Sequence, residues 1–116
     1  MTSEIEQGVA HQKAGRLAEA EDVYQRILAA EPEHPEALHW LGVLFLQRDD
    51  PLTAVELIGR ALGARPNYPQ AQCNFALALQ AQGRLQESVV AYERALALSP
   101  DDVDVQINLE IGRAHV

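Results

Sequence analysis

Apolar residues between positions 69 and 100 recur at the spacing of a helix face. The first half of this stretch carries one apolar stripe, at Ala71, Phe75, Ala78 and Leu79. The second half carries a complementary stripe, at Leu85, Val89, Tyr92, Ala95 and Leu96. Residues three and four positions apart lie on the same face of a helix, so each stripe predicts one amphipathic helix.

Glycine and proline mark the expected ends of these two helices. Gly83 lies between the stripes, where the first helix has to stop and the chain has to reverse. Pro69 precedes the pair and Pro100 follows it. Proline is tolerated at the first position of a helix and excluded from its interior, so both prolines lie where helix boundaries are expected. The segment is predicted to form a helix hairpin.

The hairpin pattern recurs when the sequence is compared with itself at a shift of 34 residues. The matching columns hold prolines (Pro32, Pro66, Pro100), leucines (Leu28, Leu62, Leu96), large residues (Tyr24, Ile58, Tyr92) and small residues (Gly8, Gly42, Ala76). A fixed period of about 20 to 50 residues is typical of repeat proteins, in which each unit covers the apolar face of its neighbour. We therefore predict an all-α solenoid of about three helix-turn-helix repeats, at 1–34, 35–68 and 69–102, with a partial fourth from 103.

Polar residues at the predicted helix starts fit this division. Ser3 and Glu6 form an S-x-x-E capping box, and Asp102 is placed to cap the helix that begins the fourth repeat. The turn of the second repeat departs from the pattern, because it has D-D-P from Asp49 onward where the third repeat has G-R-L. Asp50 before a proline is a favourable helix start, so we expect the hairpin to be kept there.

Short motifs within the repeats carry a family resemblance. W-L-G at Trp40 to Gly42 is echoed by N-F-A at Asn74 to Ala76, and G-R-L occurs at Gly15 to Leu17 and at Gly83 to Leu85. With the 34-residue period, these motifs make residues 1–109 similar to a single tetratricopeptide repeat domain. The chain resembles the N-terminal repeat arrays of O-linked N-acetylglucosamine transferase-like proteins or of other proteins that carry tetratricopeptide repeats. The resemblance implies a right-handed superhelix whose first helices line a concave groove.

The composition limits the classes of partner. The chain has 116 residues, a net charge of -8 and a pI near 4.8, which argues against nucleic acid or an anionic membrane as partner. No apolar run reaches the roughly 18 residues of a membrane span, and MTSEIEQ lacks the regions of a signal peptide, so the cytoplasm is expected. Eight arginines against one lysine favour a GC-rich bacterial gene. The single cysteine, Cys73, provides neither a disulfide nor metal-ligand spacing, and no metal or cofactor is expected.

The resemblance assigns the groove to particular columns of the first helices. In the first repeat these columns begin at Thr2, and the candidate peptide-binding residues there are Ile5, Val9 and Gln12. The candidates in the second repeat are His39, Trp40, Val43 and Gln47. The candidates that follow are Cys73, Asn74 and Leu77 in the third repeat and Asn108 in the partial fourth. Together they form a mixed polar and apolar surface.

Two features of this surface allow more than one interpretation. Trp40 is either an exposed anchor, as tryptophan often is at binding hot spots, or a side chain packed over the neighbouring repeat. Asn74 and Asn108 occupy the column that, in O-linked N-acetylglucosamine transferase-like proteins, holds a ladder of asparagines gripping peptide backbones. An amide both donates and accepts hydrogen bonds, so it can pair with a backbone of any sequence. The ladder is interrupted at Glu6 and Trp40, which leaves ordinary solvated asparagines as the alternative.

Two more specific sites find little support. His39 and Cys73 share a column one repeat apart, but nothing completes a metal or nucleophile site, so a groove-lining histidine and a small buried thiol are expected. Tetratricopeptide cochaperones hold a terminal carboxylate with lysine and asparagine in groove columns. The residues in those columns here are Ile5, Val9, Trp40, Gln70 and Asn74, of which only the last fits.

The expected function is to bind a protein or peptide segment in the groove. No acid, base, nucleophile or phosphate loop can be assembled from these residues, so the chain is predicted not to be an enzyme. The alternative is a substrate-presenting N-terminal region of a larger glycosyltransferase or sulfotransferase, whose partner includes a downstream domain of its own chain. The native sequence beyond Leu109 separates these hypotheses.

The last residues of the chain, Glu110 to Val116, form the peptide EIGRAHV. A common short-read sequencing adapter encodes this peptide in one reading frame, followed by a stop codon. Glu110 also falls in the column of Gly8, Gly42 and Ala76, where close helix packing favours a small side chain. We therefore expect 110–116 to be a non-native tail.

Overall fold

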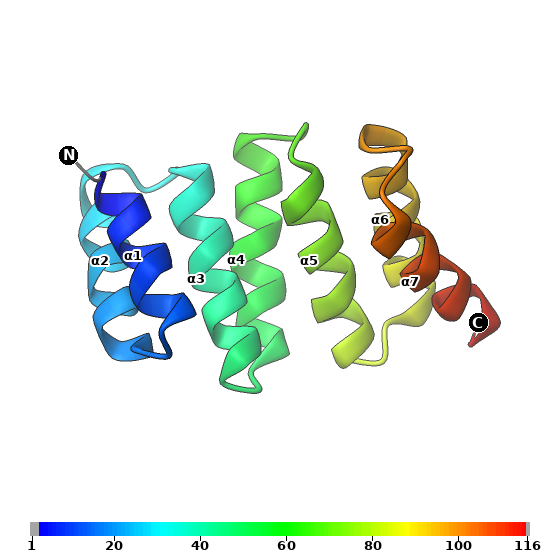
Figure 1. Cartoon of the computed structure of the whole chain (residues 1–116), viewed down its shortest axis with the longest axis horizontal. Coiled ribbons are helices and arrows are strands. Elements are labelled where there is room, and N and C mark those ends of the chain that lie inside the picture. The colour runs from blue at the N-terminus through cyan, green and yellow to red at the C-terminus, as the bar shows by residue number, and fades with distance from the viewer. Residues whose placement is uncertain (1–2, 116) are drawn as a thin grey trace.

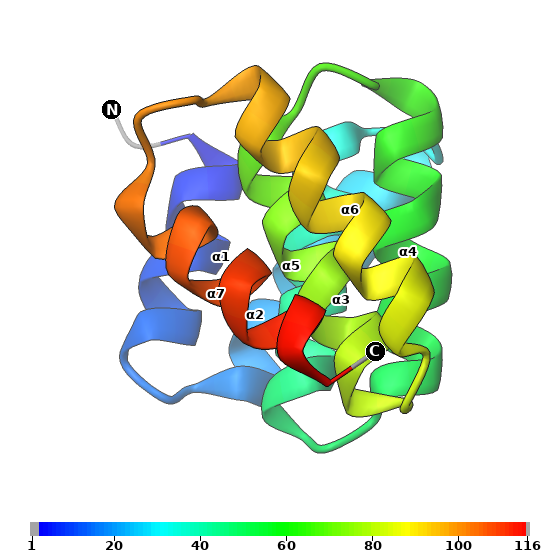
Figure 2. The same ribbon diagram turned by 90° about the vertical axis from the view of Figure 1, so that its right-hand side faces the viewer.

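The chain folds into a stack of helix hairpins. The computed structural model describes residues 3–115, and in this range it contains helices and no strand. The helices of this part are α1 (Glu4–Lys13), α2 (Leu17–Ala30), α3 (Pro35–Gln47), α4 (Pro51–Ala64), α5 (Pro69–Ala81), α6 (Leu85–Leu98) and α7 (Val103–Ala114). Figure 1 shows the three hairpins following one another along the long axis, and Figure 2, turned to the C-terminal end, has α6 and α7 nearest the viewer. The predicted all-α repeat fold is confirmed.

The helices begin where the polar residues of the sequence indicate. Ser3, Asp50 and Asp102 each accept, through the side chain, a hydrogen bond from the backbone N–H three residues later, at 3.2 Å. These bonds satisfy donors that a helix N-terminus otherwise leaves unpaired. His34 does the same for α3, with its Nδ1 accepting from the backbone N–H of Ala37 at 3.1 Å.

The turns inside the three hairpins share one backbone conformation. Gly15, Asp49 and Gly83 have positive φ angles of 83°, 63° and 77°, in the left-handed region that ends many helices. The next residue then donates its backbone N–H to the carbonyl five positions earlier, at 2.8 to 2.9 Å in each turn. The second hairpin therefore keeps the turn with aspartate in place of glycine.

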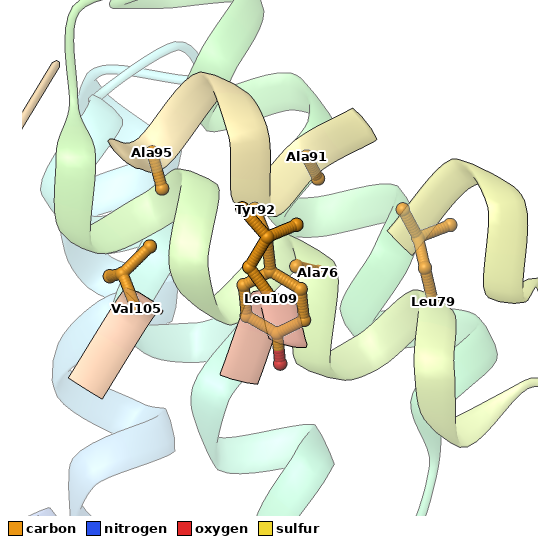
Figure 3. Packing of buried hydrophobic residues seen from close by; sticks show 7 residues of the cluster. All are labelled: Ala76, Leu79, Ala91, Tyr92, Ala95, Val105 and Leu109. Atoms are coloured by element: carbon orange, nitrogen blue, oxygen red, sulfur yellow. The ribbon is translucent and has the colours of Figure 1, made fainter. Parts of the chain in front are cut away.

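The apolar faces meet in a core that continues from hairpin to hairpin. Figure 3 shows the cluster that joins α5, α6 and α7, formed by Ala76, Leu79, Ala91, Tyr92, Ala95, Val105 and Leu109. Val105 and Leu109 belong to α7, so this helix covers the apolar side of the third hairpin. Two similar clusters surround Ile58 and Tyr24 in the earlier hairpins. Each hairpin thus depends on its neighbours for burial of its apolar face.

The column of small residues lets the two helices of a hairpin approach closely. A Cβ atom added at Gly8 would lie 2.5 Å from the ring of Tyr24, and one added at Gly42 would lie 2.5 Å from Cγ1 of Ile58. Close-packed interiors do not accommodate contacts this short without moving a neighbour. A side chain at either position would therefore force Tyr24 or Ile58 to move.

Candidate peptide-binding groove

The first helices of successive hairpins, α1, α3 and α5, lie side by side on one face of the stack (Figure 1). Each places an aliphatic residue at the same position of the repeat, and we call this set, Val9, Val43 and Leu77, the groove strip. Val9 and Val43 are half-buried, and Leu77 is 39% exposed. Ile111 on α7 falls in the same column and is 46% exposed, but it belongs to 110–116, the segment expected to be a non-native tail. The strip is a row of aliphatic side chains that the fold itself does not fully cover.

A pocket lies between α1 and α3 at one end of the groove strip. Its volume is about 280 Å³, and its lining residues are Ile5, Glu6, Val9, Ala10, Lys13, Glu36 and Trp40. Trp40 is half-buried and packs against the core cluster around Tyr24 while it also lines this pocket. The structure therefore brings Ile5, Val9 and Trp40 together. One part of the Trp40 side chain packs on the neighbouring repeat, and another part lines the pocket, where a ligand can contact it.

His39 is completely buried, so it does not line the groove as an exposed side chain, which corrects the expectation from the sequence. Its Nε2 accepts a hydrogen bond from Nδ2 of Asn74 at 2.8 Å, because an amide nitrogen can only donate. The ring proton is then on Nδ1, which donates to the hydroxyl oxygen of Tyr68 at 3.1 Å. Burial lowers the pKa of His39 to about 4, so the ring is neutral at pH 7. His39 thus joins α3 to α5.

Tyr68 belongs to the hydrogen-bonded group of His39 and Asn74, and the sequence pattern did not indicate this. It occupies the N-cap position of α5, where His34 caps α3 and Asp102 caps α7 through their side chains. Tyr68 makes no side-chain cap bond, and its ring centroid lies 5.0 Å from that of His39. The equivalent residues of the other repeats are helix caps, so the repeat pattern predicts a cap at Tyr68. It gives no indication that Tyr68 contacts His39.

Gln12 is also buried, with 4% of its surface exposed, so the expectation that it faces a partner is not met. Its Oε1 accepts a hydrogen bond from the Tyr24 hydroxyl at 2.6 Å, and its Nε2 donates to Oε1 of Gln47 at 2.7 Å. Both ends of the amide are therefore used inside the protein. Gln47 remains exposed at the end of α3.

Asn74 and Asn108 are both half-buried on the first helices α5 and α7. Asn74 uses an amide N–H for His39, and its Oδ1 takes no part in that bond. The hydrogen bond fixes the orientation of the Asn74 amide relative to α3. Thr2, which begins the predicted groove columns, lies outside the described residues.

Cys73 is half-buried and packs against the cluster of α5, α6 and α7. Burial, together with the negative charges of Asp102 and Asp104, raises the pKa of its thiol. A raised pKa leaves little thiolate at neutral pH, so the position disfavours nucleophilic chemistry. Within residues 3–115, no group of three or more His, Cys, Asp or Glu side chains is arranged to hold a metal ion. None of the helices in this range has the length and apolarity to cross a membrane.

Stacked hairpins with a row of aliphatic residues on one face define a helical repeat scaffold. Family models described as tetratricopeptide repeat match residues 5–69 and residues 69–102. The chain belongs to the tetratricopeptide repeat family.

Solved structures of the same fold cover nearly the whole chain. The first tetratricopeptide domain of Spaghetti (RPAP3), bound to the HSP90 peptide SRMEEVD, has a TM-score of 0.91 and 23% identity, covering 97% of this chain and 89% of that one. A mutant O-GlcNAc transferase from Thermobaculum terrenum has a TM-score of 0.89 and 25% identity, covering 97% of this chain and 23% of that one.

Curated relatives are much longer proteins. The peroxisomal targeting signal receptor of Eremothecium gossypii is 29% identical over 94 residues, covering 80% of this chain and 16% of that protein. The probable biofilm formation methyltransferase WspC of Pseudomonas putida is 33% identical over 94 residues, covering 80% of this chain and 22% of that protein. Human protein O-mannosyl-transferase TMTC2 is 53% identical over 45 residues, covering 39% of this chain and 5% of that protein. The chain thus spans less than a quarter of the length of each.

Proposed function

We propose that the face formed by α1, α3 and α5 binds an extended peptide segment of a partner protein. The observation that carries the proposal is the groove strip, in which Val9, Val43 and Leu77 repeat an aliphatic, partly exposed position in register. Exposed hydrophobic residues are normal when they are scattered singly, whereas a contiguous row is a feature of interaction surfaces. A rigid stack offers this surface preformed, so most of the ordering entropy of binding falls on the peptide.

Charges beside the groove strip favour a neutral or basic peptide with apolar side chains. Glu6 and Glu36 line the pocket together with Lys13, and Glu36 also lies 3.7 Å from Arg65. The net charge of -8 adds a field that repels acidic segments. Of the lysine and asparagine positions that hold a terminal carboxylate in cochaperones, this chain matches only Asn74. We therefore expect it to bind a chaperone tail such as SRMEEVD weakly.

Asn74 is the residue that we expect to contact the peptide backbone. Its amide is already held by the hydrogen bond to His39, and its Oδ1 can accept from a peptide N–H. Such a bond is independent of the peptide's side chains, so it supports binding without selecting a sequence. Selection then falls to the groove strip and to the pocket beside Trp40.

Binding can be followed through Trp40, because it is the single tryptophan of the chain. A random peptide library selected against the full chain supplies the ligand. Leu77→Ser removes the 39% exposed leucine of the groove strip, and the matched control Leu52→Ser removes a 61% exposed leucine from the second helix α4. Leu77→Ser is expected to weaken binding about tenfold, because burial of its side chain by the peptide is lost, and Leu52→Ser is expected to have no effect. Equal affinities of the two variants for the peptide would contradict the proposal.

A second candidate function rests on the similarity to the Thermobaculum terrenum O-GlcNAc transferase, of which the chain covers 23%. In a longer enzyme of that kind, the same groove holds a protein substrate for a catalytic domain elsewhere in the chain. Reading the gene beyond the codon for Leu109 in independent genomic DNA tests this. A nucleotide-sugar or sulfonate-donor domain supports the second candidate, and further repeats followed by a stop codon contradict it.

A further inference from the structure

A larger pocket lies between the second helices α4 and α6 and the first helix α5, and none of its lining residues belongs to the groove strip. It is bordered by α4, α5 and α6 and has a volume of about 520 Å³. Leu62, Phe75 and Leu98 give it an apolar wall, and Gln72 and Arg94 supply its polar groups. Nothing in the proposed peptide-binding function uses these residues.

This outer pocket has a counterpart one repeat earlier, with a volume of about 400 Å³. Equivalent residues line the two pockets 34 positions apart: Leu28 and Leu62, Leu41 and Phe75, Arg60 and Arg94. The two pockets are therefore the same inter-repeat site with different side chains. Their differences show what is particular to the outer pocket.

The arginine of this site has hydrogen-bond and ion-pair partners in the earlier pocket, where it is Arg60. In the outer pocket, where it is Arg94, it has none among the described residues. Arg60 donates from Nη2 to the carbonyl oxygen of Pro32 at 3.1 Å and lies 3.9 Å from Oε1 of Glu33. The position of Glu33 is taken in the next repeat by the neutral Asn67. Arg94 has no hydrogen bond or ion pair with any other residue of the range 3–115. The outer pocket therefore has an uncompensated positive charge at its edge.

Gln72 introduces a polar side chain at a position that is leucine one repeat earlier. Its counterpart is Leu38, which is completely buried. Gln72 is 8% exposed, and its Oε1 is buried with no hydrogen-bond donor among the described residues. A buried acceptor without a donor destabilises the protein, and a ligand that brings an N–H into the pocket removes that penalty.

Gly59 contributes no side chain to the outer pocket. The equivalent residue in the earlier pocket is Gln25, whose side chain lines it. A Cβ atom added at Gly59 would meet only Cε1 of Phe75, at the ordinary contact distance of 3.6 Å. Packing therefore does not require glycine here, in contrast to Gly8 and Gly42.

We propose that the outer pocket binds a peptide segment in which a large apolar side chain stands next to an acidic residue. The apolar side chain packs against Leu62, Phe75 and Leu98, and a peptide N–H donates to Oε1 of Gln72 once this amide turns from its buried position toward the pocket. The acidic side chain pairs with Arg94, which lacks the carboxylate neighbour that Arg60 has in Glu33. Charge complementarity thus gives this site the opposite preference to the groove strip.

The test uses the blocked peptide acetyl-Ala-Phe-Asp-Ala-amide as probe and NMR of the isotope-labelled full chain as readout. We expect saturable shift changes at the side-chain amide of Gln72 and at Phe75. The same peptide with asparagine in place of aspartate is expected to bind about tenfold more weakly, because the ion pair with Arg94 is lost. In Arg94→Gln the two peptides bind equally.

Two matched variants test whether the probe binds in the outer pocket. Gly59→Gln restores the residue of the earlier pocket and is expected to abolish binding of the probe without unfolding the chain, because the space at residue 59 accepts a side chain. Arg60→Gln, the equivalent change one repeat earlier, is expected to bind the probe as the unaltered chain does. The proposal is overturned if the unaltered chain shows no saturable changes at millimolar probe, if the changes fall on the groove strip, or if Gly59→Gln binds as well as the unaltered chain.

Discussion

At the residue scale, a buried tyrosine and the glutamine that it bonds are either both present in a hairpin or both absent from it. The Tyr24 hydroxyl donates to Oε1 of Gln12 at 2.6 Å in the first hairpin, and the Tyr92 hydroxyl donates to Oε1 of Gln80 at 3.3 Å in the third. The second hairpin has isoleucine and leucine in the same two columns. A buried hydroxyl without an acceptor destabilises the protein, which explains why tyrosine and glutamine change together.

His39 makes the stability of the fold depend on pH. Its pKa is about 4 in the folded protein, against an ordinary value of 6.5, because the ring is buried. Between these two values the unfolded chain binds a proton that the folded protein does not. The free energy of unfolding therefore falls as the pH is lowered through this window, by roughly 2 to 4 kcal/mol at its acid end. Urea unfolding measured across the window checks this.

The control for this prediction is His39→Gln, which keeps a hydrogen-bonding side chain that does not titrate. The free energy of unfolding of this variant is expected to change less with pH than that of the unaltered chain. The difference should be clearest in the upper part of the range between the folded and unfolded pKa of His39, where few carboxylates titrate. His115→Gln alters an exposed histidine and is expected to keep the pH dependence of the unaltered chain. An unchanged slope in His39→Gln would show that His39 is not the group responsible.

The sequence could place residues in columns but could not identify their partners. Gln12 and His39 fall in groove columns by repeat equivalence, yet both are buried because Tyr24 and Tyr68 bring hydroxyl groups to them. Trp40, Val43 and Leu77, which fall in groove columns too, stay partly exposed. A periodic pattern reports the position of a side chain on its helix, whereas its burial depends on the residue that faces it from another element.

At the element scale, the three hairpin turns show that one backbone conformation can be built by different residues. Gly15 and Gly83 adopt positive φ without a steric penalty, while Asp49 adopts it with a side chain present. The helix after Asp49 is held by Asp50, whose Oδ1 accepts from the backbone N–H of Thr53 at 3.2 Å. The strained backbone of the turn therefore lies at Asp49, and the cap of the next helix lies at Asp50.

Asp49→Gly is expected to stabilise the chain, because it removes the side chain from a left-handed position. The free energy of unfolding should rise by about 0.5 to 1 kcal/mol, measured by urea denaturation. The reciprocal change, Gly83→Asp, places a side chain in the equivalent turn of the third hairpin and should lower it by a similar amount. A loss of stability in Asp49→Gly would mean that the aspartate side chain makes a compensating contact.

Helix boundaries were the most predictable elements, because glycine, proline and capping residues act locally. Ser3 of the predicted capping box is the N-cap of α1, and α5 runs from Pro69 to Ala81, just before the predicted turn at Gly83. The turn at Asp49 was also predicted to be kept, from the cap at Asp50. The positive φ of Asp49 was not predicted, because aspartate occurs in many other conformations and only the repeat register indicates a turn here.

At the scale of the whole molecule, the stack separates two surfaces of different character. The groove strip lies on the first helices, beside Glu6 and Glu36. The outer pocket lies between α4, α5 and α6, beside Arg94, which has no ion pair within residues 3–115. The period of 34 residues was enough to predict the fold, because each hairpin has to cover the next. The particular lining of the outer pocket could not be predicted, because Gly59 and Gln72 depart from Gln25 and Leu38 of the preceding repeat.

The central claim is that the face of α1, α3 and α5 is the surface that holds a partner peptide. Its most direct test is an NMR map of the backbone amide shifts caused by a neutral or basic peptide selected for binding to the full chain. We expect the largest changes at Val9, Trp40, Val43, Asn74 and Leu77. Changes confined to α2, α4 and α6, with these residues unaffected, would contradict it.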